Sequence, residues 1–391
     1  MFLQIHFLTS YHATLLNRDD AGLAKRITFG GHPRLRISSQ CQKRHWREWM
    51  LQRTTLPSGL RSRHFFSRVV KLGLIEAGMP EEQAHELTFH LANNLFIAAG
   101  TKDAIDKTTL EMKQPVLLGR PEAEYFIQLV REAADGRDLP SATAYLSEKI
   151  KEGKKNFQAL LRQAGLESPA AGFDGAMFGR FVTSDVLARV DAPVHVAHAF
   201  TTHTLDTEVD FFTVVDDLSK GDETGAAHAN DMEIGAGIFY GYVAVDIPLL
   251  VQNLMGCERK AWQEQDPTDA RSLLSLFVHA VAQVTPGAKL GATAPYARSE
   301  CVVLEAGRSQ PRSLANAFLK PVRLGLNGHH PMEQSVQALA GYIDALEQMY
   351  GPDDGARWVS SLHEWPRKQE SRLSLDQAIN RALDYVFGGR A

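Results

Sequence analysis

The sequence predicts an α+β fold in which a ferredoxin-like core of strands and helices carries a long helical insertion. Three observations lead to this class. Residues 2–9 alternate as a strand does, 61–165 contain long amphipathic stretches, and 193–206 and 232–247 are rich in β-branched and aromatic residues. With the insertion removed, the elements follow the order β-α-β-β-α-β, which RNA-recognition modules share.

Local signals set the expected element boundaries along the chain. The first strand leads into a loop rich in Gly, Asp and Arg, which ends near residue 37. Ser39 is the expected N-cap of the next helix, and Gln42 completes a capping box. That helix should continue to Arg53 and end before Pro57. The remaining expected elements are helices at 62–77, 80–98, 121–134 and 141–164, strands at 193–206, 232–247 and 301–305, and helices at 269–284, 332–349 and 374–387.

The composition is that of a globular protein. Its 391 residues are 44% hydrophobic and 23% charged, and no apolar run reaches the ~18 residues of a membrane helix. The first residues lack the basic start and the cleavage site of a signal peptide. Cys41, Cys257 and Cys301 form neither a zinc motif nor a disulfide framework. We therefore expect a reduced, cytoplasmic protein that does not contact a membrane.

Charge is distributed unevenly along the chain. The net charge is −4, yet residues 18–71 contain 13 Lys and Arg against three acids, whereas 203–233 contain nine acids and one Lys. A nucleic-acid backbone responds to the local potential, so the basic stretch is a candidate interface despite the negative sum. An unevenly charged, solvated surface is the alternative interpretation. The acidic stretch could contact the basic surface of another copy.

Motifs for common enzyme chemistry are absent from the sequence. There is no phosphate-binding P-loop and no nucleophile elbow. Gly235, Gly237 and Gly241 do not have the dinucleotide-binding spacing and lie within an expected strand. His85 and His90 are five residues apart, which places them about 140° apart on a helix and prevents them from sharing one zinc ion.

Two clusters of possible metal ligands remain. They are His195, His198 and His203 in one segment, and Asp210, Asp216, Asp217 and Asp222 in another. On a strand, the second histidine would face away from the other two, which favours packing or polar contacts over a metal site. The aspartates could hold divalent cations for phosphodiester cleavage, or could form a solvated acidic loop.

The helix that begins near Ser39 combines a basic face with a docking face. Lys43 and Arg47 are one turn apart with Arg44 beside them, while Trp46 and Met50 form an apolar stripe. The amides and the positive end of the dipole at a helix N-terminus stabilise phosphate, and Ser38, Ser39 and Gln40 add neutral donors there. The pattern indicates a phosphate-binding track, although basic helices are also common on ordinary surfaces.

An ordered series of motifs resembles the CasC-type backbone subunit of the type I-E CRISPR Cascade complex. The resemblance extends from residue 1 to about residue 318, and the last seventy or so residues add little to it. The motifs are Asn17-Arg18-Asp19-Asp20, Phe29-Gly30-Gly31, Arg36-Ile37-Ser38-Ser39-Gln40, Phe178-Gly179-Arg180, Ala197-His198-Ala199-Phe200-Thr201-Thr202-His203, Asp210-Phe211-Phe212-Thr213-Val214-Val215-Asp216-Asp217-Leu218, Gly225-Ala226-Ala227-His228, Gly235-Ala236-Gly237-Ile238-Phe239-Tyr240, Pro286-Gly287-Ala288-Lys289 and Ala315-Asn316-Ala317-Phe318.

The resemblance implies a hand-shaped chain with a ferredoxin-like (RNA-recognition-like) palm, a large helical fingers insertion and an extended thumb. Residues 1–391 would form one composite domain with a palm at about 1–58 and 190–330, fingers at about 59–181, a thumb at about 205–236 and C-terminal helices at about 332–388. It implies a non-catalytic, cytoplasmic scaffold for antiviral defence, which needs no cofactor or metal. Such a subunit polymerises along CRISPR RNA into a ribonucleoprotein filament.

The same resemblance implies the partners and the mode of binding. The subunit would hold guide-RNA phosphates and display the bases for pairing with target DNA. Other copies of the chain, other Cascade subunits and a recruited nuclease-helicase would complete the complex. The residues implied to bind RNA are Arg18, Lys25, Ser38, Gln40, Lys43, Arg44, Arg47, Arg180, Phe181 and Lys289.

Phe181 departs from the family pattern, which can place a methionine wedge at a kink in the RNA. An aromatic ring can also wedge or stack, and core packing is the alternative role. A second reading of the whole chain is a metal-dependent CRISPR-associated ribonuclease that uses Asp216, Asp217 or Asp222 of an acidic thumb loop. A structural subunit without RNA contact would leave the basic track unexplained.

Overall fold

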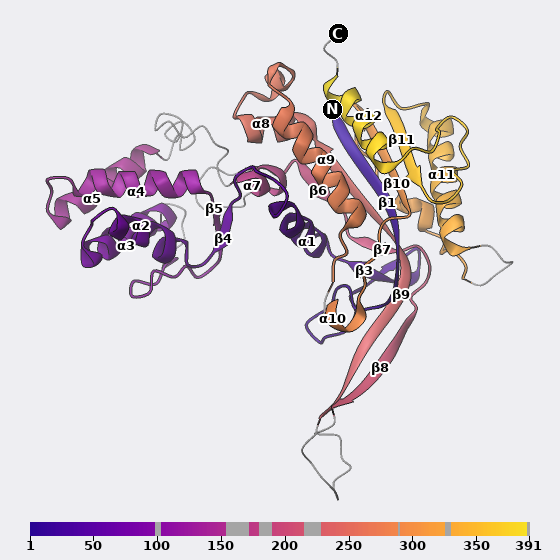
Figure 1. Ribbon diagram of the computed structural model, residues 1–391, viewed down its shortest axis with the longest axis horizontal. Helices are drawn as coiled ribbons and strands as arrows, with labels where there is room; N and C mark the ends of the chain where they lie inside the picture. The colour runs from indigo at the N-terminus through magenta and orange to yellow at the C-terminus, as the bar shows by residue number, and fades with distance from the viewer. Residues whose placement is uncertain are drawn as a thin grey trace, which may run out of the picture. The chain divides into compact units, whose positions relative to one another are not determined.

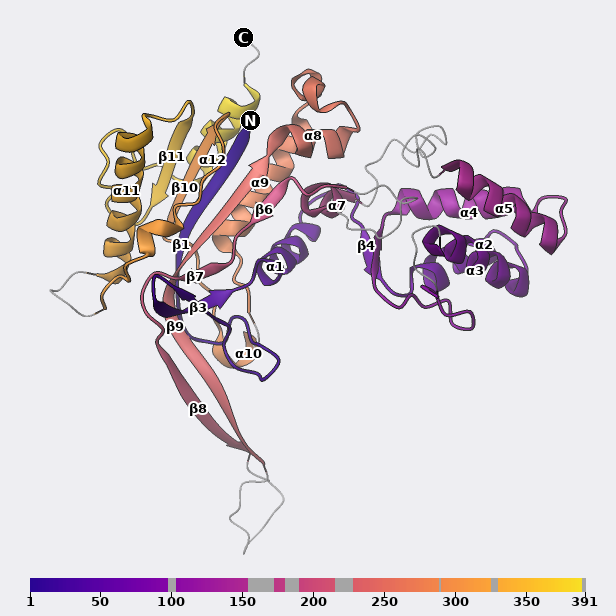
Figure 2. The same ribbon diagram turned by 180° about the vertical axis from the view of Figure 1, so that it is seen from behind.

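The computed structural model describes residues 1–97, 103–153, 172–179, 190–214, 228–287, 290–324 and 330–388. These residues form a mixed α+β fold drawn in Figures 1 and 2. Contacts divide the chain into two compact units, of which unit 1 comprises Met1–Thr54, His195–Asp246 and Arg271–Ala391, and unit 2 comprises Thr55–Val194 and Ile247–Ala270. In the described ranges, no helix is both long and apolar enough to cross a bilayer.

Unit 1 is built on a large sheet whose main path has the order β11-β10-β1-β9-β7-β3-β2, with β8 also paired to β9. The pairs in this path are antiparallel. The α+β class that the sequence predicts is confirmed, and its sheet is large and antiparallel. The strands are β1 (Phe2–Thr14), β2 (Arg26–Phe29), β3 (His32–Ile37), β6 (Val194–Val196), β7 (Ala199–Thr201), β8 (Thr207–Val214), β9 (His228–Asp246), β10 (Cys301–Gly307) and β11 (Ala356–Ser361).

Helices cover both faces of this sheet. Successive side chains of a strand point to opposite faces. Phe7 of β1 meets Trp46 of α1 (Ser39–Leu51), and the Trp46 ring lies edge-on to Phe277 of α9 (Thr268–Gln283) at 5.7 Å between centroids. The neighbouring Leu8 packs on the other side, in a cluster with Leu339 of α11 (Pro331–Tyr350). The apolar stripe expected around Trp46 therefore docks α1 on the sheet.

The strands and helices β1, α1, β7, β9, α9 and β10 occur near their expected positions in the sequence, but several boundaries differ. β1 continues to Thr14, and residues expected in a loop form the β2–β3 hairpin, which turns at Gly30 and Gly31 with positive φ angles. β8 and β11 were not expected from the sequence. β8 pairs with the first half of β9, from Thr207 opposite Gly235 to Val214 opposite His228, as a long hairpin that leaves the main sheet (Figure 1).

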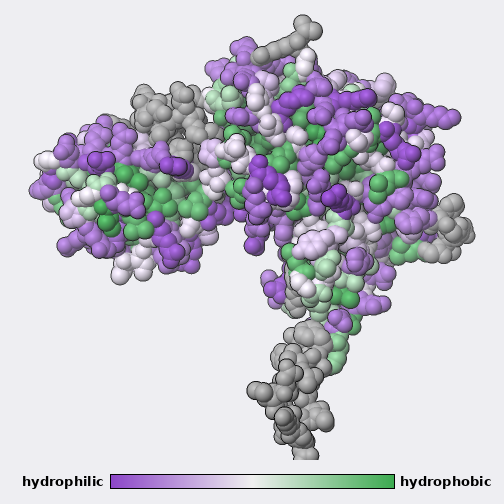
Figure 3. Space-filling view, viewed as in Figure 1, coloured by the Kyte–Doolittle hydropathy of each residue, from purple (hydrophilic) through white to green (hydrophobic). Residues whose placement is uncertain are grey.

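The described part of this hairpin exposes apolar side chains. Val209 and Phe211 of β8 are 69% and 65% exposed. In Figure 3, hydrophobic surface is visible on this part of the hairpin beside hydrophilic residues. Acidic residues alternate with the apolar residues, since Glu208 and Asp210 flank Val209. The described part of β8, within the segment expected to be the thumb, is therefore amphipathic rather than simply acidic.

Unit 2 is mainly helical. Its described core contains Phe66, Leu91, Phe126, Val130 and Leu146, which are all fully buried. The expected helix at 62–77 is divided into a π-helical turn and a short α-helix. The elements are β4 (Leu60–Ser62), the π-helical turn Phe66–Val70, α2 (Lys71–Glu76), α3 (Glu81–Ile97), β5 (Val116–Leu118), α4 (Arg120–Ala134), α5 (Leu139–Gly153), α7 (Gly172–Phe178), α8 (Ile247–Met255) and the 3-10 helix Arg259–Glu264. Segment Ile247–Ala270, within the expected palm range, groups with unit 2.

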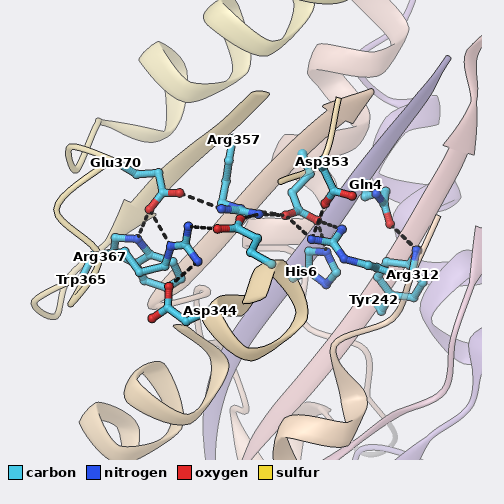
Figure 4. Close-up of polar contacts among 12 residues, drawn as sticks. Gln4, His6, Tyr242, Arg312, Asp344, Asp353, Arg357, Trp365, Arg367 and Glu370 are labelled. Carbon is cyan, nitrogen blue, oxygen red and sulfur yellow. Dashed lines mark hydrogen bonds and ion pairs between the residues drawn. The ribbon is translucent and has the colours of Figure 1, made fainter. Parts of the chain in front are cut away.

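The C-terminal part of unit 1 is joined to the sheet by buried charges, drawn in Figure 4. Arg357 of β11 donates to Glu305 of β10 at 2.7 Å and to Glu370 at 2.7 Å. Arg367, which is 3% exposed, bonds both Glu370 and Glu347. α12 (Leu375–Phe387) then packs against β10 and β11. This network orders the segment after α11.

Candidate nucleic-acid interface

The loop of residues 17–25 is tied to the N-terminus of α1. The Asn17 side-chain oxygen accepts the Ser38 N–H at 2.9 Å, and the Lys25 N–H donates to the Asn17 carbonyl at 2.8 Å. The Lys25 carbonyl accepts the Arg36 N–H at 2.8 Å. Exposed Arg18 and half-buried Lys25 are therefore carried by an ordered loop.

The first turn of α1 is capped by Ser38 and not by Ser39, which corrects the expected capping box. The Ser38 hydroxyl accepts the Cys41 N–H at 3.3 Å, and Ser38 is 6% exposed. Gln42 turns inward, and its amide donates to the Ala197 carbonyl at 3.0 Å. The Ser39 N–H donates to Nδ1 of His198 at 3.1 Å. Two amides that we expected to be free for phosphate thus have protein partners.

One side of α1 carries Gln40, Lys43 and Arg47, which we call the helix track. Their spacing of three and four residues places them on one side of the helix, next to the buried stripe of Gln42, Trp46 and Met50. Gln40 is exposed, and the two cations are half-buried. Burial lowers the pKa of Lys43. Because a half-buried ammonium loses hydration, a phosphate next to it would restore favourable interactions.

Arg44 does not follow the helix track. Its Nε donates to the carboxylate of Glu48 at 2.9 Å, one turn further along α1. Both side chains are largely exposed, and this pair raises the pKa of Arg44. Arg44 is therefore partly neutralised by its own helix.

A second group of basic side chains meets α1 at Ser39. It consists of Lys25, Arg36 and His198, which we call the N-terminal cluster. Nη1 of Arg36 lies 3.2 Å from Nδ1 of His198. Partial burial lowers the pKa of His198, and the positive charges of Arg36 and Lys25 lower it further. The cluster is thus a region of positive potential around a neutral imidazole.

Sequence reasoning did not select Arg36 and His198 as site residues. Arg36 belongs to the basic stretch, and His198 was considered as a possible metal ligand. Their contact joins residues 162 positions apart, so no local pattern reveals it. The proximity of His198 to Ser39 depends on the pairing of β3 with β7, in which Ile37 is opposite Ala199.

Three predicted RNA-binding residues, Arg180, Phe181 and Lys289, lie outside the described residues. The chain just before Lys289 can be placed, because the Gly287 N–H points to Nε2 of His45 on α1 at 3.4 Å. This loop therefore begins beside the helix that carries the helix track.

The basic stretch is not uniformly available for binding. Arg34 is completely buried and donates to the carbonyls of Thr201 and Phe318 at 2.8 Å. Arg26 pairs with the buried carboxylate of Glu233. Of the counted cations, those from Arg61 onwards belong to unit 2. The charge excess of residues 18–71 is therefore divided between structural and surface roles.

The three histidines do not converge on a metal. Nδ1 of buried His203 bonds the Thr204 carbonyl at 2.7 Å, and its Nε2 accepts the Ile238 N–H at 3.2 Å, so both nitrogens have protein partners. His195 is exposed on β6, and His198 joins the N-terminal cluster. Across the ranges that the structure describes, no group of three metal-ligating side chains occurs. Asp216, Asp217 and Asp222 lie outside these ranges.

The fold is that of chains from CRISPR RNA-guided surveillance complexes. One solved chain, from a "CRISPR RNA-guided surveillance complex, pre-nicking", is 25% identical, with a TM-score of 0.77 over 98% of this chain and 100% of that chain. Another, from a "CRISPR RNA-guided surveillance complex", is 21% identical, with a TM-score of 0.59 over 99% and 100%, which bears on the fold alone. Residues 3–385 match the CT1975-like protein family, so the chain belongs to that family. No match was found among curated proteins.

Proposed function

We propose that this protein is a non-catalytic backbone subunit of a CRISPR RNA-guided surveillance complex, and that several copies bind side by side along the guide RNA. The near-complete coverage of a chain from such a complex supports this assignment. The family match over residues 3–385 agrees with it. A subunit of this kind holds phosphates, while base pairing with the target DNA supplies the sequence specificity.

The arrangement of elements supports the division of the chain into a palm, fingers and a thumb. The strand order β10-β1-β9-β7, with α1 and α9 between strands, fits a ferredoxin-like palm. The helical unit 2 fits the fingers, and the β8–β9 hairpin fits the thumb. Exposed Val209 and Phe211 give the thumb a contact surface for another macromolecule. We further propose that Arg180, Phe181 and Lys289 contact the RNA, with Phe181 as the wedge or stacking residue.

The helix track is the observation that carries the proposal. Lys43 and Arg47 lie one turn apart on α1, beside Gln40, in a pattern that can follow a sugar-phosphate backbone. These residues offer cations and an amide to phosphates but no arrangement for reading one base. Binding should therefore be nearly independent of RNA sequence.

The double variant Lys43→Ala with Arg47→Ala tests the proposal. Loss of two phosphate contacts should reduce the slope of log affinity against log salt by about 1.4 on single strands, and should weaken binding to all RNA sequences alike. The matched control is Lys368→Ala with Arg381→Ala, which removes two exposed cations outside the helix track and the N-terminal cluster. Equal affinity and salt slope in the helix-track variant and the wild type would contradict the proposal.

A further inference from the structure

His198 accepts two hydrogen bonds at the same ring nitrogen. The Ser39 N–H lies 3.1 Å from Nδ1, and Nη1 of Arg36 lies 3.2 Å from it. A backbone amide and a guanidinium can only donate, so Nδ1 must carry the lone pair. The hydrogen of the neutral ring is therefore on Nε2. Because the side chain of His198 is exposed, this N–H is a donor available to a ligand.

The side chains around this donor carry positive charge that no carboxylate of the described residues pairs with. Across the described ranges, no carboxylate oxygen lies within the 4.0 Å ion-pair distance of the side-chain nitrogens of Lys25 or Arg36. The nearby Asp19 carboxylate instead accepts the N–H groups of Ala21 and Leu23 in its own loop. Lys25 and Arg36, two cations from separate segments, thus lie beside one neutral imidazole, whose Nδ1 holds Arg36 and whose Nε2–H points away from Arg36 on another edge of the ring.

We propose that Lys25, Arg36 and His198 form a binding subsite for the RNA backbone, in which Lys25 and Arg36 bind one phosphate while His198 positions Arg36 through Nδ1 and donates a neutral hydrogen bond from Nε2 to the neighbouring phosphate. This inference rests on the proposed RNA-binding function. The lone pair on Nδ1 directs the Arg36 guanidinium, which keeps its other N–H groups for the phosphate. The Ser39 N–H fixes the ring relative to α1, so the subsite precedes the helix track at Gln40.

Three single variants, titrated with poly-uridine RNA over a salt series, test the subsite. Arg36→Ala should weaken binding by about 10-fold or more and lower the salt slope by about 0.7, because one ionic contact is lost. His198→Ala should weaken binding by about 3- to 10-fold with an unchanged salt slope, because a neutral contact is lost. His198→Gln should bind within about 2-fold of the wild type, since its amide supplies both an acceptor and a donor. His195→Ala, which removes another exposed imidazole of unit 1, is the control and should bind as the wild type does.

Other results would overturn the subsite. If His198→Ala binds RNA as tightly as the wild type does, His198 is not part of the subsite. If His198→Ala lowers the salt slope as much as Arg36→Ala does, the imidazole binds as a cation and not as a neutral donor. The same strand with deoxyribose is the second probe. A loss in His198→Ala on RNA but not on DNA would move the contact from phosphate to the ribose hydroxyl. If His198 and Arg36 variants bind normally while the helix-track variant does not, the subsite fails and the proposed function stands.

Discussion

Nε of Arg357 lies 2.7 Å from the carboxylate of Glu305, and both side chains are less than a tenth exposed. Arg312 reaches the same carboxylate at 2.9 Å, and Nε2 of His6 lies 3.2 Å from it. Glu305 therefore joins β1, β10, β11 and the segment before the 3-10 helix Ala315–Phe318 (Figure 4). A buried carboxylate with three polar partners stabilises the fold only while all of them are present.

Glu305→Ala should destabilise unit 1 by about 3–5 kcal/mol, because it leaves Arg312 and His6 without their buried partner. Urea unfolding monitored by circular dichroism measures the loss. The control is Glu48→Ala, which breaks the exposed pair with Arg44 and should cost less than about 1 kcal/mol. Equal losses in the two variants would contradict the role assigned to the Glu305 network.

Stability should fall as the pH is lowered below about 6.5, because His6 is buried in its neutral form. Burial lowers the pKa of His6, so the unfolded chain takes up this proton first and the free energy of unfolding decreases with pH. Burial alone would raise the pKa of Glu305, but the hydrogen bond of His6 and the charges of Arg357 and Arg312 hold it well below its usual range. A further loss of stability follows when the unfolded carboxylate is protonated in stronger acid.

His6→Gln isolates the histidine part of this dependence. The Gln side chain can accept from the Tyr240 hydroxyl and donate to Glu305, as the neutral imidazole does. Free energies of unfolding measured between pH 8 and about pH 5 should decline less steeply in the variant than in the wild type, because burial also lowers the pKa of His203 and that part of the decline remains. A wild-type stability that rises on acidification would contradict a neutral buried His6.

Gly30→Ala should be more destabilising than Gly31→Ala, although the two residues share one turn. Both have positive φ angles, which cost an alanine roughly 1–2 kcal/mol. A Cβ at Gly30 would also lie 1.8 Å from the Leu319 carbonyl oxygen, whereas a Cβ at Gly31 meets nothing within 4 Å. Thermal unfolding of both variants compares them, and equal melting temperatures would show that the turn does not pack against Leu319.

Asn17→Ala should weaken RNA binding by about 3- to 10-fold without changing the salt slope, because Asn17 carries no charge but holds the loop of Lys25 to Ser38. Filter binding at several salt concentrations separates affinity from slope. Asn94→Ala, which removes a side-chain bond to Ser147 in unit 2, is the control. An unchanged affinity in Asn17→Ala would mean that RNA binding does not depend on the hydrogen bond between Asn17 and Ser38.

Periodic segments were predictable from the sequence, and contacts between distant segments were not. The expected helix at 269–284 and the observed α9 agree because apolar residues recur there with helical spacing over a long segment. The β2–β3 hairpin was missed because its short strands border Gly30 and Gly31, which also fit a loop. The cap is Ser38 and not Ser39 because the helix begins one residue earlier than expected, so that Ser38 has the extended backbone of a cap and its hydroxyl accepts the Cys41 N–H.

In the candidate site, too, relationships within one segment were predictable and contacts between distant segments were not. Lys43 and Arg47 could be predicted because their relationship lies within one helix. Arg34 was counted as a surface cation, but its carbonyl partners come from segments more than 160 residues away in sequence. Sequence alone gives the charge of an arginine, and tertiary structure decides whether the arginine faces solvent.

The central claim is that the protein coats RNA in register and does not cut it. The most direct measurement titrates the protein with single-stranded RNAs of increasing length at two salt concentrations, and runs the same samples on denaturing gels with and without Mg²⁺. Intact RNA that takes up protein in steps set by its length, more weakly at high salt, is the expected result. RNA shortened only with Mg²⁺, and protected by Asp217→Ala, would instead establish a metal-dependent ribonuclease.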